Sequence, residues 1–141
     1  MTRTSNALAA IFLFALSLTA LVGCSRGDSP LDGTHWKLSN WTLSSLRPAD
    51  FTITAEFADG KISGSSGVNS YSGPYELGSQ NGFAVGPLAG TQMAGPEPAM
   101  RAEGAYLTLL GQARSYTLAE GRLTLFDEGR NESLSFEAAS R

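Results

Sequence analysis

Apolar and polar residues alternate over short stretches of this chain, which is the pattern of β-strands with one buried face. The clearest stretch runs from Phe51 to Phe57, where every second residue is apolar. Asp59-Gly60 follows, a pair that tolerates the positive φ angles of two-residue hairpin turns. The alternation resumes over residues 61–64, so we expect a tight hairpin here.

The same alternation predicts further strands wherever it is bounded by turn residues. These strands are expected at residues 34–41, 71–77, 83–88, 115–119, 122–126 and 132–137. The predicted turns between strands lie at residues 47–50, at Asn81-Gly82, at Glu120-Gly121 and at Glu128-Gly129. The chain should therefore form about eight strands.

One segment, residues 97–113, has a different period. Met100, Leu107 and Leu110 recur at helical spacing, and Pro96 and Pro98 stand where the first turn of a helix tolerates proline. We predict a mainly β domain of the α+β class. It is a single antiparallel, strongly curved or barrel-like sheet of about eight strands, with one α-helix at about 97–113 packed on it.

Glu103 falls on the same helical stripe as Met100 and Leu107, which is unusual for a carboxylate. It is either a rim position that reaches water or a surface arginine, or a partly buried acid hydrogen-bonded to strand amides. A buried charge would need such partners.

The N-terminus has the form of a signal peptide. Arg3 is the only charge in the first six residues, and an uncharged run from Ala7 follows and ends in Leu21-Val22-Gly23-Cys24. This ending resembles the lipobox of bacterial lipoproteins. The resemblance implies cleavage between Gly23 and Cys24 and lipidation of Cys24 with an S-diacylglycerol and an N-acyl chain such as palmitate.

This resemblance also implies a location. In Gram-negative cells an aspartate after the lipidated cysteine favours the inner membrane, whereas this chain has Ser25. We therefore expect a cell-envelope protein that is lipid-anchored in the outer membrane and faces the periplasm. The expected organisation is a signal peptide at 1–23, a polar tether at 24–31 and a domain at 32–138.

Charge and composition exclude several classes of function. The net charge is −3 before the leader and its Arg3 are removed, which disfavours contact with nucleic acid. One cysteine and one histidine make a thiolate zinc site or a Cys/His catalytic pair hard to assemble, and we predict no metal and no cofactor. We expect a monomer.

Candidate catalytic patterns fail in detail. The segment Ser63-Gly64-Ser65-Ser66-Gly67 lacks the spacing of a phosphate loop or of a hydrolase nucleophile elbow, so we interpret it as a turn between strands. His35 is expected at a surface or strand edge near the tether. Acid pairs among Glu97, Glu103, Asp127 and Glu128 remain conceivable, with a solvated turn as the alternative for the last two. Tyr71 and Tyr75 could stack on a ligand or pack in the core.

The body from about residue 31 to 136 resembles the META domain of HslJ-like bacterial lipoproteins. The likeness is carried, in order, by residues 33–38, by Ile62-Ser63-Gly64-Ser65-Ser66-Gly67-Val68-Asn69-Ser70-Tyr71-Ser72-Gly73-Pro74-Tyr75, by Thr91-Gln92-Met93-Ala94-Gly95-Pro96 with the helix that follows, and by 116–126. Its signature residues are Gly67, Asn69, Tyr71, Gly73 and Glu103. We interpret them as structural, with Asn69 and Gly73 as turn and bulge formers.

Val68 and Gly95 stand where the family often has cysteines. We hypothesise that these two positions are close enough for a disulfide in relatives, and that apolar contact replaces it here.

The resemblance implies a noncatalytic protein associated with heat shock, stress response and novobiocin tolerance. We expect it to support outer-membrane integrity through contacts with an envelope protein or surface. Two alternatives remain open: a binding module for a small hydrophobic or acyl ligand held by Tyr71, Tyr75 and the helix, or an inhibitor of a periplasmic hydrolase that uses an exposed glycine-rich loop.

Overall fold

The computed structural model describes residues 29–43 and 45–140, which form a closed antiparallel β-barrel with one helix packed on it. The predicted leader, Cys24 and the tether up to residue 28 lie outside the described residues. The strands are β1 Thr34–Trp41, β2 Thr54–Ala58, β3 Lys61–Ser65, β4 Ser70–Gly78, β5 Gly82–Val85, β6 Ala89–Gly90, β7 Ser115–Ala119, β8 Arg122–Phe126 and β9 Glu132–Ala138. The helix is α1 Glu97–Gln112, and two short 3-10 helices are η1 Pro48–Asp50 and η2 Ser79–Asn81. The predicted fold class is confirmed.

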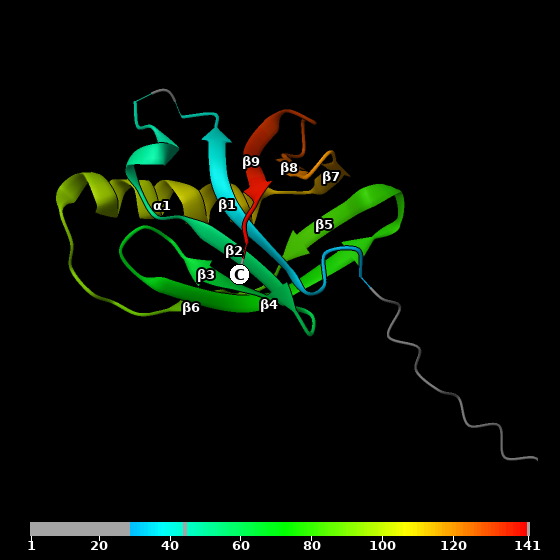
Figure 1. Ribbon diagram of the computed structural model, residues 1–141, viewed down its shortest axis with the longest axis horizontal. Helices are drawn as coiled ribbons and strands as arrows, with labels where there is room; N and C mark the ends of the chain where they lie inside the picture. Colours follow the sequence, from blue (N-terminus) through cyan, green and yellow to red (C-terminus); the bar gives the residue numbers. More distant parts are fainter. Residues whose placement is uncertain (1–28, 44, 141) are drawn as a thin grey trace, which may run out of the picture.

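The barrel closes because β3 pairs with both β2 and β4. The order around it is β3-β2-β1-β9-β8-β7-β5-β4, and the short β6 adds to the edge of β4. In Figure 1, β3, β4 and β6 in green form one side, β7, β8 and β9 in orange and red form another, and α1 in yellow lies across the barrel. The junction of β5 with β7 is the weakest, with Gly82↔Ser115 as its single register pair.

The core is the interior of the barrel and is filled by aromatic side chains. Phe57 is fully buried, with its ring centroid 4.9 Å from Tyr75 and 6.3 Å from Phe83. Helix α1 adds Ala102, Tyr106 and Leu110, each fully buried. These helix residues are spaced by four, one turn apart, so a single stripe of the helix faces the sheet.

Most predicted elements are found at the expected places. The strands predicted at 34–41, 115–119 and 122–126 have the same bounds as β1, β7 and β8, and α1 ends one residue before the predicted limit. Asp59 and Gly60 both adopt positive φ, at 52° and 74°, as the predicted hairpin turn requires.

Three local predictions are wrong. Residues 63–65 continue β3, and the turn is at 66–69. The positive φ angles of the β4–β5 connection fall on Gln80 and Asn81, so the turn is one residue earlier than Asn81-Gly82. Gly73 lies in regular register opposite Ile62 and forms no bulge. It is required because a Cβ there would approach the Pro87 carbonyl oxygen to 2.6 Å.

The domain also begins earlier than predicted. Leu31, which was assigned to the tether, is fully buried in the core. The Ser29 hydroxyl lies 2.9 Å from the Tyr75 hydroxyl. The first residues of the domain are therefore 29–31, because they already supply core packing.

Candidate functional site

Two of the signature residues, Asn69 and Glu103, meet at the end of the turn between β3 and β4. The Asn69 side-chain Nδ2 donates to Glu103 Oε1 at 2.8 Å and to the Met93 carbonyl oxygen at 3.2 Å. Its Oδ1 accepts from the Met93 amide at 2.7 Å and from the Thr91 hydroxyl at 2.9 Å. Every hydrogen-bonding position of this amide is used, and the residue is 6% exposed.

Glu103 completes the cluster from helix α1. Its Oε2 accepts from the Asn69 backbone amide at 2.8 Å and from the Ser66 hydroxyl at 2.6 Å. We call Ser66, Asn69 and Glu103 the Glu103 cluster. It joins three segments, namely the 66–69 turn, the extended residues 91–93 and the helix. Of the two interpretations of Glu103, the partly buried and hydrogen-bonded acid is the correct one.

The local backbone explains why these residue types stand here. Gly67 has φ of +118°, a conformation that glycine adopts without strain. A Cβ built on Gly67 would lie 3.6 Å from the Ala99 carbonyl oxygen in the first turn of α1. The turn can therefore approach the helix closely enough for its amides to reach Glu103. Hydrogen bonds from amides commonly stabilise a partly buried carboxylate.

The electrostatics of the cluster do not fit general base catalysis. Partial burial would raise the pKa of the Glu103 carboxyl, but the hydrogen bonds from the 66–69 turn outweigh it and hold that pKa below its usual range. A general base works best with a pKa near the operating pH. Ser66 is fully buried, and the hollow beside the cluster measures about 60 Å³. The arrangement stabilises the fold.

Tyr71 is the signature residue that connects this cluster to the core. Its hydroxyl donates to the Thr54 carbonyl oxygen at 2.9 Å and lies 2.6 Å from the Tyr106 hydroxyl. Burial raises the pKa of both phenols, so both stay neutral at physiological pH. Tyr71 and Tyr75 are 4% and 6% exposed, so they pack in the core and present no open strip for a ligand.

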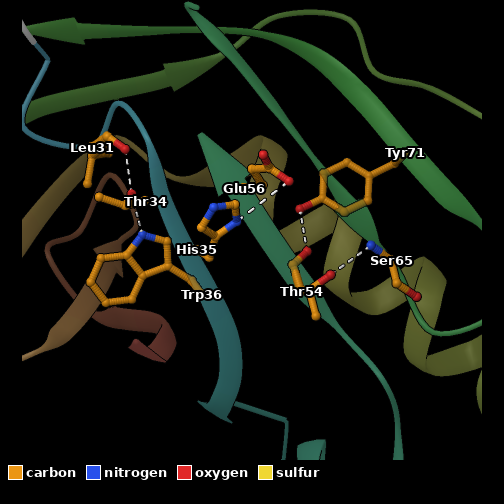
Figure 2. Close-up of polar contacts among 8 residues, drawn as sticks. All are labelled: Leu31, Thr34, His35, Trp36, Thr54, Glu56, Ser65 and Tyr71. Atoms are coloured by element: carbon orange, nitrogen blue, oxygen red, sulfur yellow. Dashed lines mark hydrogen bonds and ion pairs between the residues drawn. The ribbon is translucent and has the colours of Figure 1, made fainter. Parts of the chain in front are cut away.

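His35 lies in the interior of the sheet, since β1 pairs with β2 on one side and β9 on the other. Its Nδ1 is 3.6 Å from Glu56 Oε2, directly across the β1–β2 pair. Figure 2 shows this ion pair beside the Thr54 carbonyl that accepts from Tyr71. The arrangement is a cross-strand pair of the kind that supports a sheet. Of the two predicted positions, the strand edge is wrong and the surface is correct, since His35 alternates with the buried Trp36 and its side chain is 22% exposed on the outer face of the sheet.

Three of the four acids that might have paired are held by separate partners. Glu97 lies 3.8 Å from Arg101, and Glu103 is in its cluster. The Asn131 backbone and side-chain amides hold the pKa of Asp127 below its usual range. Glu128 is exposed in the turn before β9. Within residues 29–43 and 45–140, no group of three His, Cys, Asp or Glu side chains could hold a metal ion.

A groove beside β7 was missed by sequence reasoning. It measures about 540 Å³ and lies between η2 and the start of β7, lined by Gln80, Asn81, Arg114, Ser115, Thr117 and Arg130 among others. Gln80, Asn81 and Arg130 all have positive φ, from 55° to 62°. The sequence feature that would have indicated this groove is the β4–β5 turn, whose positive φ angles begin at Gln80, one residue before the predicted position. In the described part of the chain, no helix is long and apolar enough to cross a membrane.

Comparison with known proteins gives a consistent result. A protein from Burkholderia xenovorans, solved by NMR, is 30% identical, with a TM-score of 0.65 over 79% of this chain and 85% of that chain. A second NMR structure is 20% identical with a TM-score of 0.55, over 76% of this chain and 90% of that one. A crystal structure of a DUF4847 family protein from Bacteroides vulgatus is 14% identical, with a TM-score of 0.57 over 79% of this chain and 96% of that one, and shares the fold.

No match is found among curated proteins. Residues 29–140 match the META domain, which confirms the resemblance seen in the glycine, asparagine and tyrosine-rich segment and in the helix that follows. The chain belongs to the META domain family.

Proposed function

We propose that this protein is a noncatalytic lipoprotein of the bacterial envelope that supports outer-membrane integrity under stress through contacts with other envelope proteins. The observation that carries the proposal is the sequence Leu21-Val22-Gly23-Cys24, placed directly before a META domain that begins at residue 29. A short polar tether leaves the domain close to the membrane surface. Several acyl chains on Cys24 would make release negligible.

The interior of the domain supports a noncatalytic role. The META family is not a known enzyme family. Ser66 and Glu103, the pair most like a nucleophile and base, are consumed in hydrogen bonds that hold the helix to the barrel. The domain therefore acts through its surface.

The two alternative functions were motivated by a ligand pocket beside Tyr71 and by an exposed glycine-rich loop, and the described residues form neither. The space beside Tyr71 is about 60 Å³, whereas ligand pockets measure about 300–1,000 Å³. The glycine-rich segment is strand β3 and a turn fixed to α1, with Ser66 fully buried, so it is no free inhibitory loop.

Labelling with radioactive palmitate tests the anchor. The wild-type protein should incorporate label and Cys24→Ala should not. Ser25→Asp is the matched control, because it keeps the lipid and should move the protein to the inner-membrane fraction. Unlabelled wild-type protein would exclude the lipoprotein assignment.

A deletion strain tests the role. It should become sensitive to heat, detergent and novobiocin, and the wild-type gene should restore tolerance while Cys24→Ala should not. Unchanged sensitivity in the deletion strain would exclude a role in envelope integrity, whatever the outcome of the labelling.

A further inference from the structure

Within the described residues, strand β7 is paired on one side only over most of its length. It pairs with β8 from Ser115 to Ala119, but with β5 only at Ser115. Past that pair, β7 lies beside η2, the tip of the β4–β5 hairpin. Thr117, Leu118 and Ala119 are all exposed, and Leu118 is 42% exposed.

This edge is short, but it lacks the charged residues and proline that commonly protect sheet edges. Proteins shield free sheet edges with charged residues, proline or bulges, because unpaired amide and carbonyl groups template pairing with another chain. Residues 117–119 carry neither a charge nor a proline, and the irregular register near them is on the β8–β9 side. An uncharged edge with an exposed leucine is suited to accept a further strand.

The 540 Å³ groove adjoins the start of this edge and contains two cations. Arg114 Nη1 donates to the carbonyl oxygens of Gly111 and Ala113, at 2.9 and 2.8 Å, which fixes its guanidinium at the end of α1 and leaves its other N–H donors available. Among the described residues, no carboxylate lies within 4 Å of the guanidinium nitrogens of Arg114 or Arg130.

The groove also holds two acids, Asp127 and Glu128, so the formal charges of its lining balance. The Asp127 carboxylate accepts hydrogen bonds from the Asn131 backbone and side-chain amides, and Glu128 is exposed. The two guanidinium groups are therefore the groups in the groove that can bind an incoming carboxylate, and guanidinium matches carboxylate geometry well.

We infer that β7 and the adjoining groove bind an extended peptide segment of another envelope protein, which adds as a strand beside residues 117–119 and places an aspartate or glutamate side chain against Arg114 and Arg130. Main-chain hydrogen bonds supply affinity in this mode and side-chain contacts supply specificity. Leu118 offers the apolar contact and the two arginines the charged one. The inference rests on the proposed function, since it names the partner class through which the domain would act.

The test uses the purified full-length protein in detergent and a phage library of internally displayed peptides. Enriched peptides should alternate apolar and polar residues and contain an acidic residue. Each is then synthesised with blocked ends, and its Kd is measured by fluorescence anisotropy, together with copies in which alternate backbone amides are N-methylated. N-methylation on one strand parity should abolish binding, because it removes the ladder hydrogen bonds.

Variants of the protein localise the site. Arg130→Gln should weaken binding about tenfold, as expected for loss of a charge-assisted hydrogen bond, and Leu118→Asp should abolish it. Arg101→Gln and Met100→Asp are matched controls on exposed positions of α1 and should leave the Kd unchanged.

Three outcomes would overturn the inference. They are a lack of enriched peptides, enriched peptides that bind Leu118→Asp and Arg130→Gln as tightly as the wild type, or sedimentation that shows a dimer lost in Leu118→Asp. The last would mean that the edge is occupied by a second copy of the chain. None of these results depends on lipidation or on the deletion phenotype, so failure here is distinct from failure of the proposed function.

Discussion

Val68 and Gly95 provide a quantitative test of how the 66–69 turn lies against the segment before α1. A Cβ built on Gly95 lies 3.4 Å from Val68 Cβ and 2.8 and 2.9 Å from its two methyl groups. Cβ atoms in disulfides are separated by about 3.5–4.5 Å. A shift of a few tenths of an ångström therefore suffices for a disulfide in the double variant Val68→Cys, Gly95→Cys.

The loop that this bridge would close sets the size of the effect. It contains about 28 residues, for which the loss of loop entropy in the unfolded chain corresponds to about 3.6 kcal/mol. In a domain of this size, 1 kcal/mol shifts Tm by about 4 °C. The oxidised double variant should therefore melt about 10–15 °C above its reduced form.

The assay is thermal and urea unfolding of the double variant in a Cys24→Ala background, where the two new thiols are the only ones. Mass spectrometry and thiol titration confirm that the bridge has formed. Thiols that stay free under oxidation, or an oxidised form no more stable than the reduced one, would refute the proximity of the two segments.

A double-mutant cycle with alanine tests the same geometry without a disulfide. Gly95→Ala alone should destabilise the domain by about 1–3 kcal/mol, because the new Cβ overlaps the Val68 methyl groups. Val68→Ala should relieve that overlap, so the double variant should be more stable than the sum of the two single changes predicts. Additive effects would contradict the contact.

Three further predictions concern the interior. Glu103→Gln should lower the free energy of unfolding by about 1–3 kcal/mol at pH 7, measured in urea. Because the folded state lowers the pKa of Glu103, the stability difference between wild type and variant should be complete above the pKa of the unfolded carboxyl. It should shrink as the pH falls through the folded-state pKa. Tyr71→Phe should cost more than Tyr106→Phe, each about 1–3 kcal/mol, since the first leaves two partners unbonded and the second one. Gly73→Ala should destabilise by about 1–3 kcal/mol through contact with the Pro87 carbonyl, whereas Gly104→Ala, with open space around it, should gain up to about 1 kcal/mol of helix propensity in thermal melts.

Each of these has a control and an outcome that contradicts it. Glu97→Gln on the exposed face of α1 should change stability by less than about 0.5 kcal/mol at any pH. A Glu103→Gln difference that grows on acidification would show that the carboxylate is not the stabilising form. Equal losses for the two tyrosines would exclude Tyr71 as the central member of the pair, and a neutral Gly73→Ala would exclude the close approach.

The strands could be predicted because their signal is local. Alternation over five to eight residues and paired turn residues such as Asp59-Gly60 depend on neighbours in the sequence, and β1, β7 and β8 are found at the predicted bounds. The predictions that failed depend on distant contacts. Gly73 is required by the carbonyl of Pro87, and Leu31 is buried by a barrel that the sequence pattern does not place over it.

Glu103 shows the same limit more clearly. Helical spacing placed it on one stripe of α1 with Met100 and Leu107 but could not distinguish a rim acid from a bonded one, because its partners lie 34 and 37 positions away. The groove beside β7 was invisible for a related reason. It arises where the β4–β5 hairpin turns one residue earlier than predicted and stops short along β7, which depends on barrel closure rather than on any motif.

The residues that carry the family likeness and those available to a partner are therefore different sets. Internal hydrogen bonds use the polar groups of Asn69, Tyr71 and Glu103, and the first two of these residues are buried. A change at these positions would lower the stability of the whole domain, so loss of function there cannot locate a binding site. Leu118 and Arg130 are exposed and lie outside the Glu103 cluster, so substitutions there can separate recognition from stability. The proposed recognition of a partner is therefore tested at surface positions such as these, and the stability of the barrel at the signature residues.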